Sequence, residues 1–463
     1  MSANPATPPT NLSSPRRQRR SIFGGLLLIS IGILFLLHEH LPELGIWHLF
    51  SRYWPLLLIL WGLAKLFDSL AADRAGESKP PLVTGGEMAL VVALLLIVGG
   101  MISVDWIHRK NPDFSWGEGW FSQKYSTTEE LPVQPVKPGS EIHVSTDRGN
   151  ITVYADESND LRIIAYKTAT ASSQYQAQKR AEQASVSIQS VAGGYEIQPI
   201  KTEQGNGAVK VDLEVHIPKQ ASVTAKSDRG DINISDVSGG LNISTESGDI
   251  EIHGAGGDVT AELHRGDARV SEVKGNVRVS GRGNVIELED IGGDAAIDGE
   301  FYGPIRVNNV KNTTTYNSAR TQLTLLHLSG RFEMDSGGLQ ISDVAGNAIL
   351  STHNRDVEVE NVAGRLQIAS THGDVQVRYA QPPKEEVTIT NDSGGVDLTL
   401  PAKASFEISA VSRSGDVQSD FEDSGLQLVN DNDTHKLSGK FGSRGPRIQI
   451  ATTYGTISLR KGE

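Results

Sequence analysis

Apolar and polar residues alternate in short runs between Gly230 and Phe301, and the alternation repeats every nine residues. Aligned, the units read GDINISDVS, GGLNISTES, GDIEIHGAG, GDVTAELHR, GDARVSEVK, GNVRVSGRG, NVIELEDIG and GDAAIDGEF. Positions three and five are mostly apolar, which predicts a strand with one face toward a core. Position one is Gly in all units but one, and position two is usually Asp, a pair typical of tight turns. Each unit therefore predicts one strand and one turn.

A fixed period this short indicates a solenoid, because no unit can bury its apolar side alone and stability must come from stacked neighbours. Two units make one coil of a flattened roll with two parallel sheets. Each coil adds roughly 4.8 Å along the axis. The fold class we expect is all-β, a parallel β-solenoid of nine-residue half-coils, preceded by three transmembrane α-helices.

The repeat extends over residues 140–463, with interruptions. An Ala/Gln-rich stretch near 171–185 breaks the strand pattern and favours an inserted helix. After Pro382 the strands continue with looser spacing and end in RIQIATTYGTISLR. Further nine-residue units begin at Ser140, Gly149, Gly303, Asn312, Thr321 and Gly337.

The first 139 residues have a different pattern. Residues 1–21 are polar and end in four arginines, which predicts a disordered basic cytoplasmic tail. Residues 22–106 contain three apolar runs, which predict a three-helix transmembrane anchor. Residues 107–139 are rich in aromatic residues and Pro, which predicts a linker that holds the next domain off the lipid.

Positive charge predicts the orientation of this anchor. The arginines before the first apolar run favour a cytoplasmic N-terminus. Three crossings from that side place everything after Val104 outside the cell. We expect the bacterial cytoplasmic (inner) membrane, with an extracytoplasmic C-terminal domain.

Two stretches resemble known families. GGLLLISIG at residues 24–32 and YWPLLLILWG at residues 53–62 resemble the LiaI/LiaF-like transmembrane region of bacterial envelope-stress proteins. That resemblance implies a membrane anchor and a link to envelope-stress signalling. The strand VDLEVHIP, the repeated S/T-x-x-G-D-I pattern and the closing TTYGTI resemble the family of bacterial β-repeat proteins called putative adhesins. This second resemblance covers roughly residues 140–460, and it implies no catalytic residues.

Composition limits the classes of partner that we expect the protein to bind. The net charge of −13 argues against a nucleic-acid partner, since phosphate binding needs a basic face. The absence of cysteine excludes disulfides, Cys-ligated metals and Cys nucleophiles. We expect contact with the lipid bilayer, with an envelope glycan or protein, and with further copies of the chain through exposed sheet edges.

Two features of the sequence could suggest a metal-binding site, but we predict no bound metal at either. The Gly-Asp repeat lacks the second Gly and the ligating Asp of calcium-binding rolls, so the Asp row is better explained as turn chemistry. His38, Glu39, His40 and His48 stand near a predicted membrane edge, where metal binding or pH sensing competes with an ordinary polar loop. We favour the loop, and we expect no cofactor.

Parallel β-helices also include enzymes that cleave polysaccharides, which need clustered acids or an acid with Arg or Lys. The candidates here are His264 with Arg265, and the run His353–Asp356. Both fall at turns, where charged residues are normally only solvated. No Gly-rich phosphate loop, Ser-centred elbow or HExxH motif occurs. We therefore expect no catalytic residues and no enzyme activity.

Three functions remain. The first is a non-enzymatic adhesion or scaffold module on the cell envelope, which acts by multivalent surface contact. The second is envelope-stress sensing, with the helices relaying a signal to a partner. The third is an enzyme acting on envelope polysaccharide.

Overall fold

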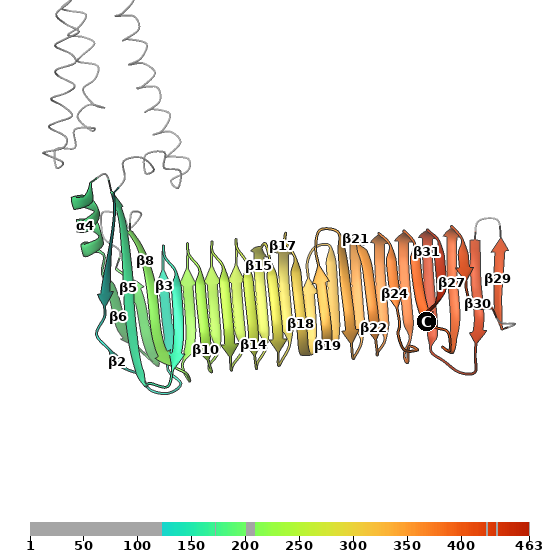
Figure 1. Ribbon diagram of the computed structural model, residues 1–463, viewed down its shortest axis with the longest axis horizontal. Coiled ribbons are helices and arrows are strands. Elements are labelled where there is room, and N and C mark those ends of the chain that lie inside the picture. The colour runs from blue at the N-terminus through green and yellow to red at the C-terminus, as the bar shows by residue number, and fades with distance from the viewer. Residues whose placement is uncertain (1–122, 172, 201–208, 423–424, 432–433, 463) are drawn as a thin grey trace, which may run out of the picture. The chain divides into compact units, whose positions relative to one another are not determined.

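The computed structural model describes residues 123–171, 173–200, 209–422, 425–431 and 434–462. All of them fall within one of two compact units of the chain, Ser122–Glu463. Within this unit the strands stack side by side into a long β-solenoid (Figure 1).

The central coils have the predicted repeat. Strands pair in parallel with the strand two further along the chain, so that Ile232 lies beside Ile250, and Ile250 beside Ala268. From β9 to β17 the even-numbered strands form a first ladder and the odd-numbered strands a second, with the core between them. The long strand β18 contributes to both, because its first part pairs with β16 and its last part with β17. The strands of these coils are β9 (Ser222–Ser227), β10 (Ile232–Val237), β11 (Leu241–Thr245), β12 (Ile250–Ala255), β13 (Val259–Leu263), β14 (Ala268–Val273), β15 (Val277–Gly283), β16 (Ile286–Ile291), β17 (Ala295–Phe301) and β18 (Ile305–Asn317).

The core consists of the apolar positions that the alternation selects. Ile232 and Ile234 from the first ladder, and Leu241 and Ile243 from the second, are all at most 3% exposed. Because each coil buries only a few small and branched side chains, its core depends on the coils above and below it.

One coil runs backward. β19 (Thr321–Met334) pairs antiparallel with β18 on one side and with β20 (Gly338–Val344) and β21 (Ala348–Asn354) on the other. Two tight turns cause the reversal. Thr321 N donates to Ser318 Oγ at the first, and Gly337 N and Gly338 N donate to Asp335 Oδ1 at the second. The prediction that Thr321 begins a forward unit is therefore wrong.

Parallel stacking then resumes. Val357 lies beside Leu339 and Val375 beside Val357 in the first ladder, again at 18-residue spacing. The strands of this second parallel stack are β22 (Asp356–Val362), β23 (Leu366–His372), β24 (Val375–Arg378), β25 (Val387–Ser393) and β26 (Val396–Pro401).

The N-terminal coil lies inside the stack. β3 pairs with both β7 and β9, and β4 pairs with both β8 and β10. Outside them, β5 pairs with β8, β1 pairs with β5, and helix α4 contacts both β1 and β5. The elements are β1 (Gln123–Glu130), β2 (Gln134–Pro135), β3 (Glu141–Thr146), β4 (Ile151–Asp156), β5 (Asp160–Ala171), α4 (Gln174–Gln183), β6 (Val186–Val191), β7 (Gly194–Pro199) and β8 (Val209–Pro218).

The C-terminal coil is also internal. β31 lies between β25 and β27, and β32 lies between β26 and β28, so the chain ends before the last coil of the stack (Figure 1). Beyond them, β30 pairs with β27 and β29 pairs with β30. The strands are β27 (Phe406–Ser414), β28 (Val417–Ser419), β29 (Leu426–Asp431), β30 (Thr434–Phe441), β31 (Arg447–Tyr454) and β32 (Ile457–Gly462).

The structure confirms the mostly-β fold and the 18-residue coil. Helix α4 lies within the stretch near 171–185 that predicts one. Strands begin at Gln123, inside the segment 107–139 that reads as a linker, because residues 123–130 form a complete ladder with β5. The three predicted transmembrane helices lie outside the described residues. Within the described part, no helix has the length and apolar character needed to cross a membrane.

Candidate functional site

The S/T-x-x-G-D motif ties each coil to its neighbour. Thr245 lies inside the solenoid and its hydroxyl donates to the carbonyl oxygen of Gly230, in the preceding coil, over 3.4 Å. Gly248 stacks directly on Gly230, and a Cβ on Gly248 would lie 2.2 Å from the Gly230 oxygen. Gly248 also has a φ of +150°, which L side chains rarely adopt. The glycine is therefore required by the close stacking of the backbones.

The Asp of the motif forms a ladder from coil to coil. The amide of Asp249 donates to Asp231 Oδ1 over 2.9 Å, and the amide of Asp267 donates in turn to Asp249 Oδ1 over 2.9 Å. The sequence predicts hydrogen bonds within the same turn, whereas the structure places the donor 18 residues away. These carboxylate oxygens satisfy backbone amides that would otherwise lack a partner.

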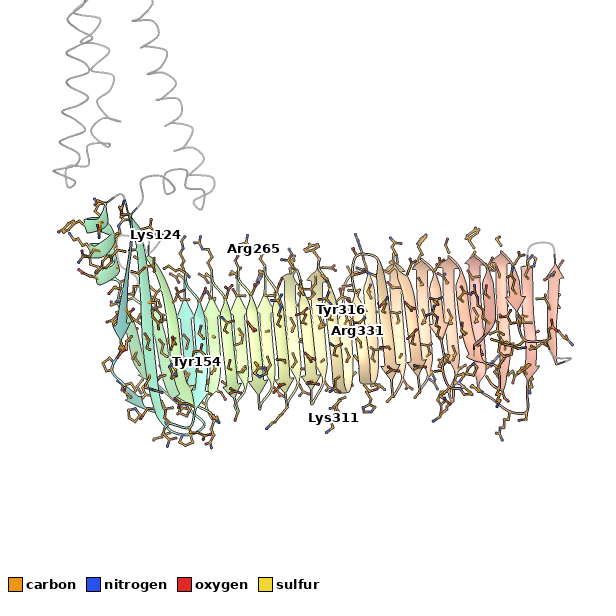
Figure 2. All side chains as sticks on the ribbon, viewed as in Figure 1. Lys124, Tyr154, Arg265, Lys311, Tyr316 and Arg331 are labelled. Carbon is orange, nitrogen blue, oxygen red and sulfur yellow. The ribbon has the colours of Figure 1, made fainter. Side chains whose placement is uncertain are left out.

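The opposite edge of the coils contains a row of left-handed corners. From β10 to β22, each strand of the first ladder has one residue with a φ between 52° and 61°, except β12, where Gly254 has a φ of 72°. Figure 2 shows Arg265 and Lys311 at these two opposite edges. The non-glycine members of the corner row are Asp236, Glu272, Asp290, Asn309, His327, Asp343 and Asn361.

A shallow groove of about 630 Å³ follows part of this row. Its lining includes Glu272, Asp290 and His327 beside Lys274 and Lys311. Asp290 Oδ1 accepts a hydrogen bond from the Asn309 side chain at 2.6 Å, and His327 Nδ1 lies 2.5 Å from the Lys311 carbonyl oxygen. These polar groups are engaged with neighbouring coils, as expected for side chains that fix a corner.

The first ladder carries a charged outer face. We call the outward residues of β10 to β28 in this ladder the charged face. Arg306 hydrogen-bonds to Glu287 over 2.8 Å and to Glu333 over 3.1 Å, and these bonds raise the pKa of Arg306 above its usual value. Arg269 bridges Glu287 and Asp267 in the same way. The charges on this face therefore neutralise one another across coils.

The second ladder carries no charge in two central rows of its outer face over seven adjoining strands. We call these rows the neutral face. Every member is exposed or half-buried. Asn317 donates to Asp298 Oδ1 over 3.1 Å, whereas hydroxyl and amide groups such as those of Thr390 and Gln367 face solvent. The residues of the neutral face, in stacking order, are Thr315, Thr324, Ile349, Gln367, Thr388, Gln449 and Ser409 in one row, and Asn317, Gln322, Ser351, Ala369, Thr390, Ala451 and Val411 in the other.

The residues considered for catalysis do not converge. His264 lies 3.8 Å from Glu246 with both side chains about half exposed, next to Arg265 in the turn between β13 and β14. His353 lies at the end of β21, several coils away, and its Nδ1 is 3.5 Å from Thr371 Oγ1.

The other members of the second candidate have structural contacts. Arg355 donates to the carbonyl oxygen of Asp335, and Asp356 Oδ1 accepts from the amide of Asp374. His38, Glu39, His40 and His48 lie outside the described residues. In the part of the chain that the structure describes, no three His, Asp or Glu side chains are placed to hold a metal ion.

The neutral face and the corner row do not appear when the chain is read in nine-residue units. Successive units contribute to opposite ladders, so both features repeat every 18 residues. The signal was present at position seven, where alternate units carry Asp, Gly or Glu before an apolar residue, as in Asp236 and Glu272. Asp and Asn tolerate the left-handed corner better than most residues.

Comparison with solved structures gives remote matches. A "putative cell adhesion protein" from Clostridium sporogenes is 10% identical, with a TM-score of 0.16, over 73% of this chain and 100% of its own. A "putative adhesin" from Bacteroides fragilis is 13% identical, with a TM-score of 0.18, over 72% of this chain and 97% of its own. Both TM-scores are too low to inform function. No curated protein matches the chain.

Family comparison gives two matches at separate places. Residues 22–66 match the LiaI-LiaF-like transmembrane region, which indicates that the protein is associated with a membrane. Residues 269–460 match the family described as Toastrack DUF4097, and they contain the backward coil and the neutral face. The chain thus joins a LiaI-LiaF-like transmembrane region to a solenoid whose C-terminal part matches the Toastrack family.

Proposed function

We propose that this protein is a bacterial cell-envelope protein, anchored in the cytoplasmic membrane, whose solenoid acts without catalysis as an adhesion or scaffold module. Its N-terminus lies in the cytoplasm and its solenoid lies outside. The charge pattern supports this orientation, because the arginines at residues 16–20 precede the first apolar run.

The neutral face is the observation that carries the proposal. It presents hydroxyl, amide and small apolar side chains at the spacing of adjacent strands, roughly 4.8 Å. A neutral, hydroxyl-rich polymer suits such a surface, because both partners hydrogen-bond and neither must desolvate a charge. Each coil adds a weak contact, and many weak contacts along one ligand give avidity. We infer that the ligand is an uncharged glycan of the envelope.

The arrangement of polar side chains supports a role without catalysis. The group His264–Arg265 and the group His353–Asp356 lie on separate coils, and His264, His353 and Asp356 contact neighbouring coils. A glycan-cleaving enzyme would instead need two acidic groups on either side of one bond.

A second candidate is envelope-stress sensing, which the match of residues 22–66 favours. In that role the solenoid would detect envelope damage and the membrane region would relay the signal to a partner protein.

Deletion of Ser140–Glu463 separates these functions. We expect loss of attachment or of envelope integrity, measured by adhesion and by sensitivity to lysis. Loss of a stress response alone, with attachment intact, would favour sensing. Glycan turnover by the purified unit Ser122–Glu463 would contradict both and identify an enzyme.

A further inference from the structure

The two ladders end unequally at the C-terminal end of the stack. In the first ladder the last strand is β28, which pairs only with β32 among the described strands. In the second ladder, β30 and then β29 follow β27. The second ladder therefore extends two strands beyond the first, and β28 and β29 each have one edge that no described strand pairs with.

The inner side of this overhang is apolar and uncovered. Leu428 lies opposite Leu437 in the β29–β30 register, so both point to the core side. Leu437 is 3% exposed, but Leu428 is 53% exposed because no strand of the first ladder lies across from it. A hollow of about 720 Å³ lies between β28 and β29. Its lining is apolar at Val417, Phe421, Leu426, Leu428 and Leu437, and polar at Gln418, Ser419 and Glu422.

The edge of β29 lacks the features that usually prevent strand pairing. Its sequence, LQLVND, contains no Lys or Pro, and its register with β30 is regular. The other end of the solenoid differs. The outer strand β1 contains Lys124, Glu129 and Glu130, and it contacts helix α4. The second ladder ends here in β6, whose sequence VSIQSV also contains no Lys or Pro and which pairs only with β7 among the described strands. The C-terminal end is therefore distinguished by its two-strand overhang, whose inner side is exposed at Leu428.

We propose that the C-terminal end of the solenoid binds the same end of a second copy about a two-fold axis. In that arrangement β29 of each copy lies beside β28 of the other, and continues its first ladder. The two-strand overhang of one copy fills the two-strand gap of the other, so the fit is self-complementary, as an isologous interface requires. Leu428 of each copy then enters the hollow of the other.

Charge also favours a second copy at this end. Two chains of net charge −13 repel one another, so they associate best where charge is low. β29 contributes one charged residue, Asp431, and Glu422 lines the hollow, while the adjacent β30 contributes Lys436 and Lys440 of opposite sign. A solenoid dimer of this kind doubles the number of neutral faces, but the inference does not rest on the proposed function.

Cysteine cross-linking tests the arrangement directly, because the native chain contains no cysteine. Gln418→Cys lies on β28 and Val429→Cys on β29, both on outer faces. We expect mixed full-length single variants to form a 418–429 disulfide between copies in membranes under mild oxidation. Ser126→Cys on β1 is the control and should stay monomeric when mixed with Gln418→Cys.

Leu428→Lys should reduce the cross-link at least tenfold, because it replaces the leucine that packs against the apolar side chains of the hollow with a longer, charged side chain. Ile349→Lys, at a similarly exposed site on the neutral face, should leave the cross-link unchanged. It tests glycan binding instead, so the two proposals fail separately. Absence of the 418–429 product, or its persistence in Leu428→Lys, would overturn the proposed dimer, as would equal cross-linking through Ser126→Cys.

Discussion

The charged face and the neutral face belong to the same coils, yet they use their outward side chains in opposite ways. On the charged face, Arg306 links Glu287 to Glu333, and Arg378 contacts Glu358 and Glu360. Those groups are already paired within the protein. On the neutral face, residues such as Thr390 and Gln367 are exposed to solvent. One face thus pairs many of its charged groups between coils, whereas the other exposes hydroxyl and amide groups that the proposed ligand could bind.

This difference shows that a solenoid can separate stability from recognition on its two sides. The hydrogen bonds that hold the coils in register lie at the turns and inside, as for Thr245 and Asp249. Outward positions are then free to vary without loss of the fold. Substitutions that should affect both faces, or only one of them, test this separation.

Gly248→Ala should have the largest effect, because it disturbs the stacking on which both faces depend. The new Cβ would lie 2.2 Å from the Gly230 carbonyl oxygen, at a φ of +150°. We expect a loss of at least about 3 kcal/mol in the free energy of unfolding of Ser122–Glu463, measured by urea denaturation. Gly240→Ala is the control, since its nearest atom is 3.6 Å away. Equal stability of the two variants would contradict the stacking role.

Arg269→Gln should have a smaller effect, restricted to the charged face. It removes the contacts with Asp267 and Glu287 at 3.0 and 3.1 Å. Since Arg269 is 44% exposed, solvent screening limits the loss to about 0.5 kcal/mol. The loss should shrink at high salt, because ions screen exposed pairs. Thr388→Gln on the neutral face should change nothing at either salt concentration. A loss for Arg269→Gln that is independent of salt would indicate packing instead of charge.

Acid should produce the smallest effect, at the turn that restores the forward direction after β19. Hydrogen bonds from the amides of Gly338 and Gly337 lower the pKa of Asp335. A lowered folded-state pKa means that this carboxylate stabilises the fold above its unfolded pKa of about 3.9 and ceases to do so as the pH falls through the folded value. Asp335→Asn should reduce the decrease in melting temperature that acid causes, measured by thermal unfolding at a series of pH values. An unchanged dependence of the melting temperature on acid pH would show that the turn does not depend on the charge of Asp335.

The sequence was sufficient to predict the coil, because the determinants of the coil are local. Alternation selects Ile232 and Ile250 for the core, and the structure stacks them in register. The Gly-Asp turn needs only its own residues and the coil below. The direction of a strand, however, is not encoded by alternation. TQLTLLHLS alternates equally well in either direction, so β19 reads as a forward unit although it runs backward.

The order of coils at the ends was not predictable either. β31 and β32 are the last strands in sequence, but they lie between β25–β26 and β27–β28. Every parallel strand presents a similar edge, so the choice of neighbour depends on the whole stack. The neutral face was missed for a related reason. Its members lie on alternate nine-residue units. Units of the first ladder, such as the one at Gly337, stand between them, so the absence of charge is not visible when all units are aligned at one period.

Binding of the purified unit Ser122–Glu463 to isolated bacterial cell walls tests the central claim most directly. Thr390→Glu places a charge on the neutral face, and Thr399→Glu makes the same change on the charged face, between Arg378 and Arg460. We predict that co-sedimentation with cell walls falls at least tenfold for Thr390→Glu and is unchanged for Thr399→Glu. A neutral glucan should compete with the cell walls for binding to the native protein. Loss of binding in Thr399→Glu alone, or equal binding by all three proteins, would contradict the assignment of recognition to the neutral face.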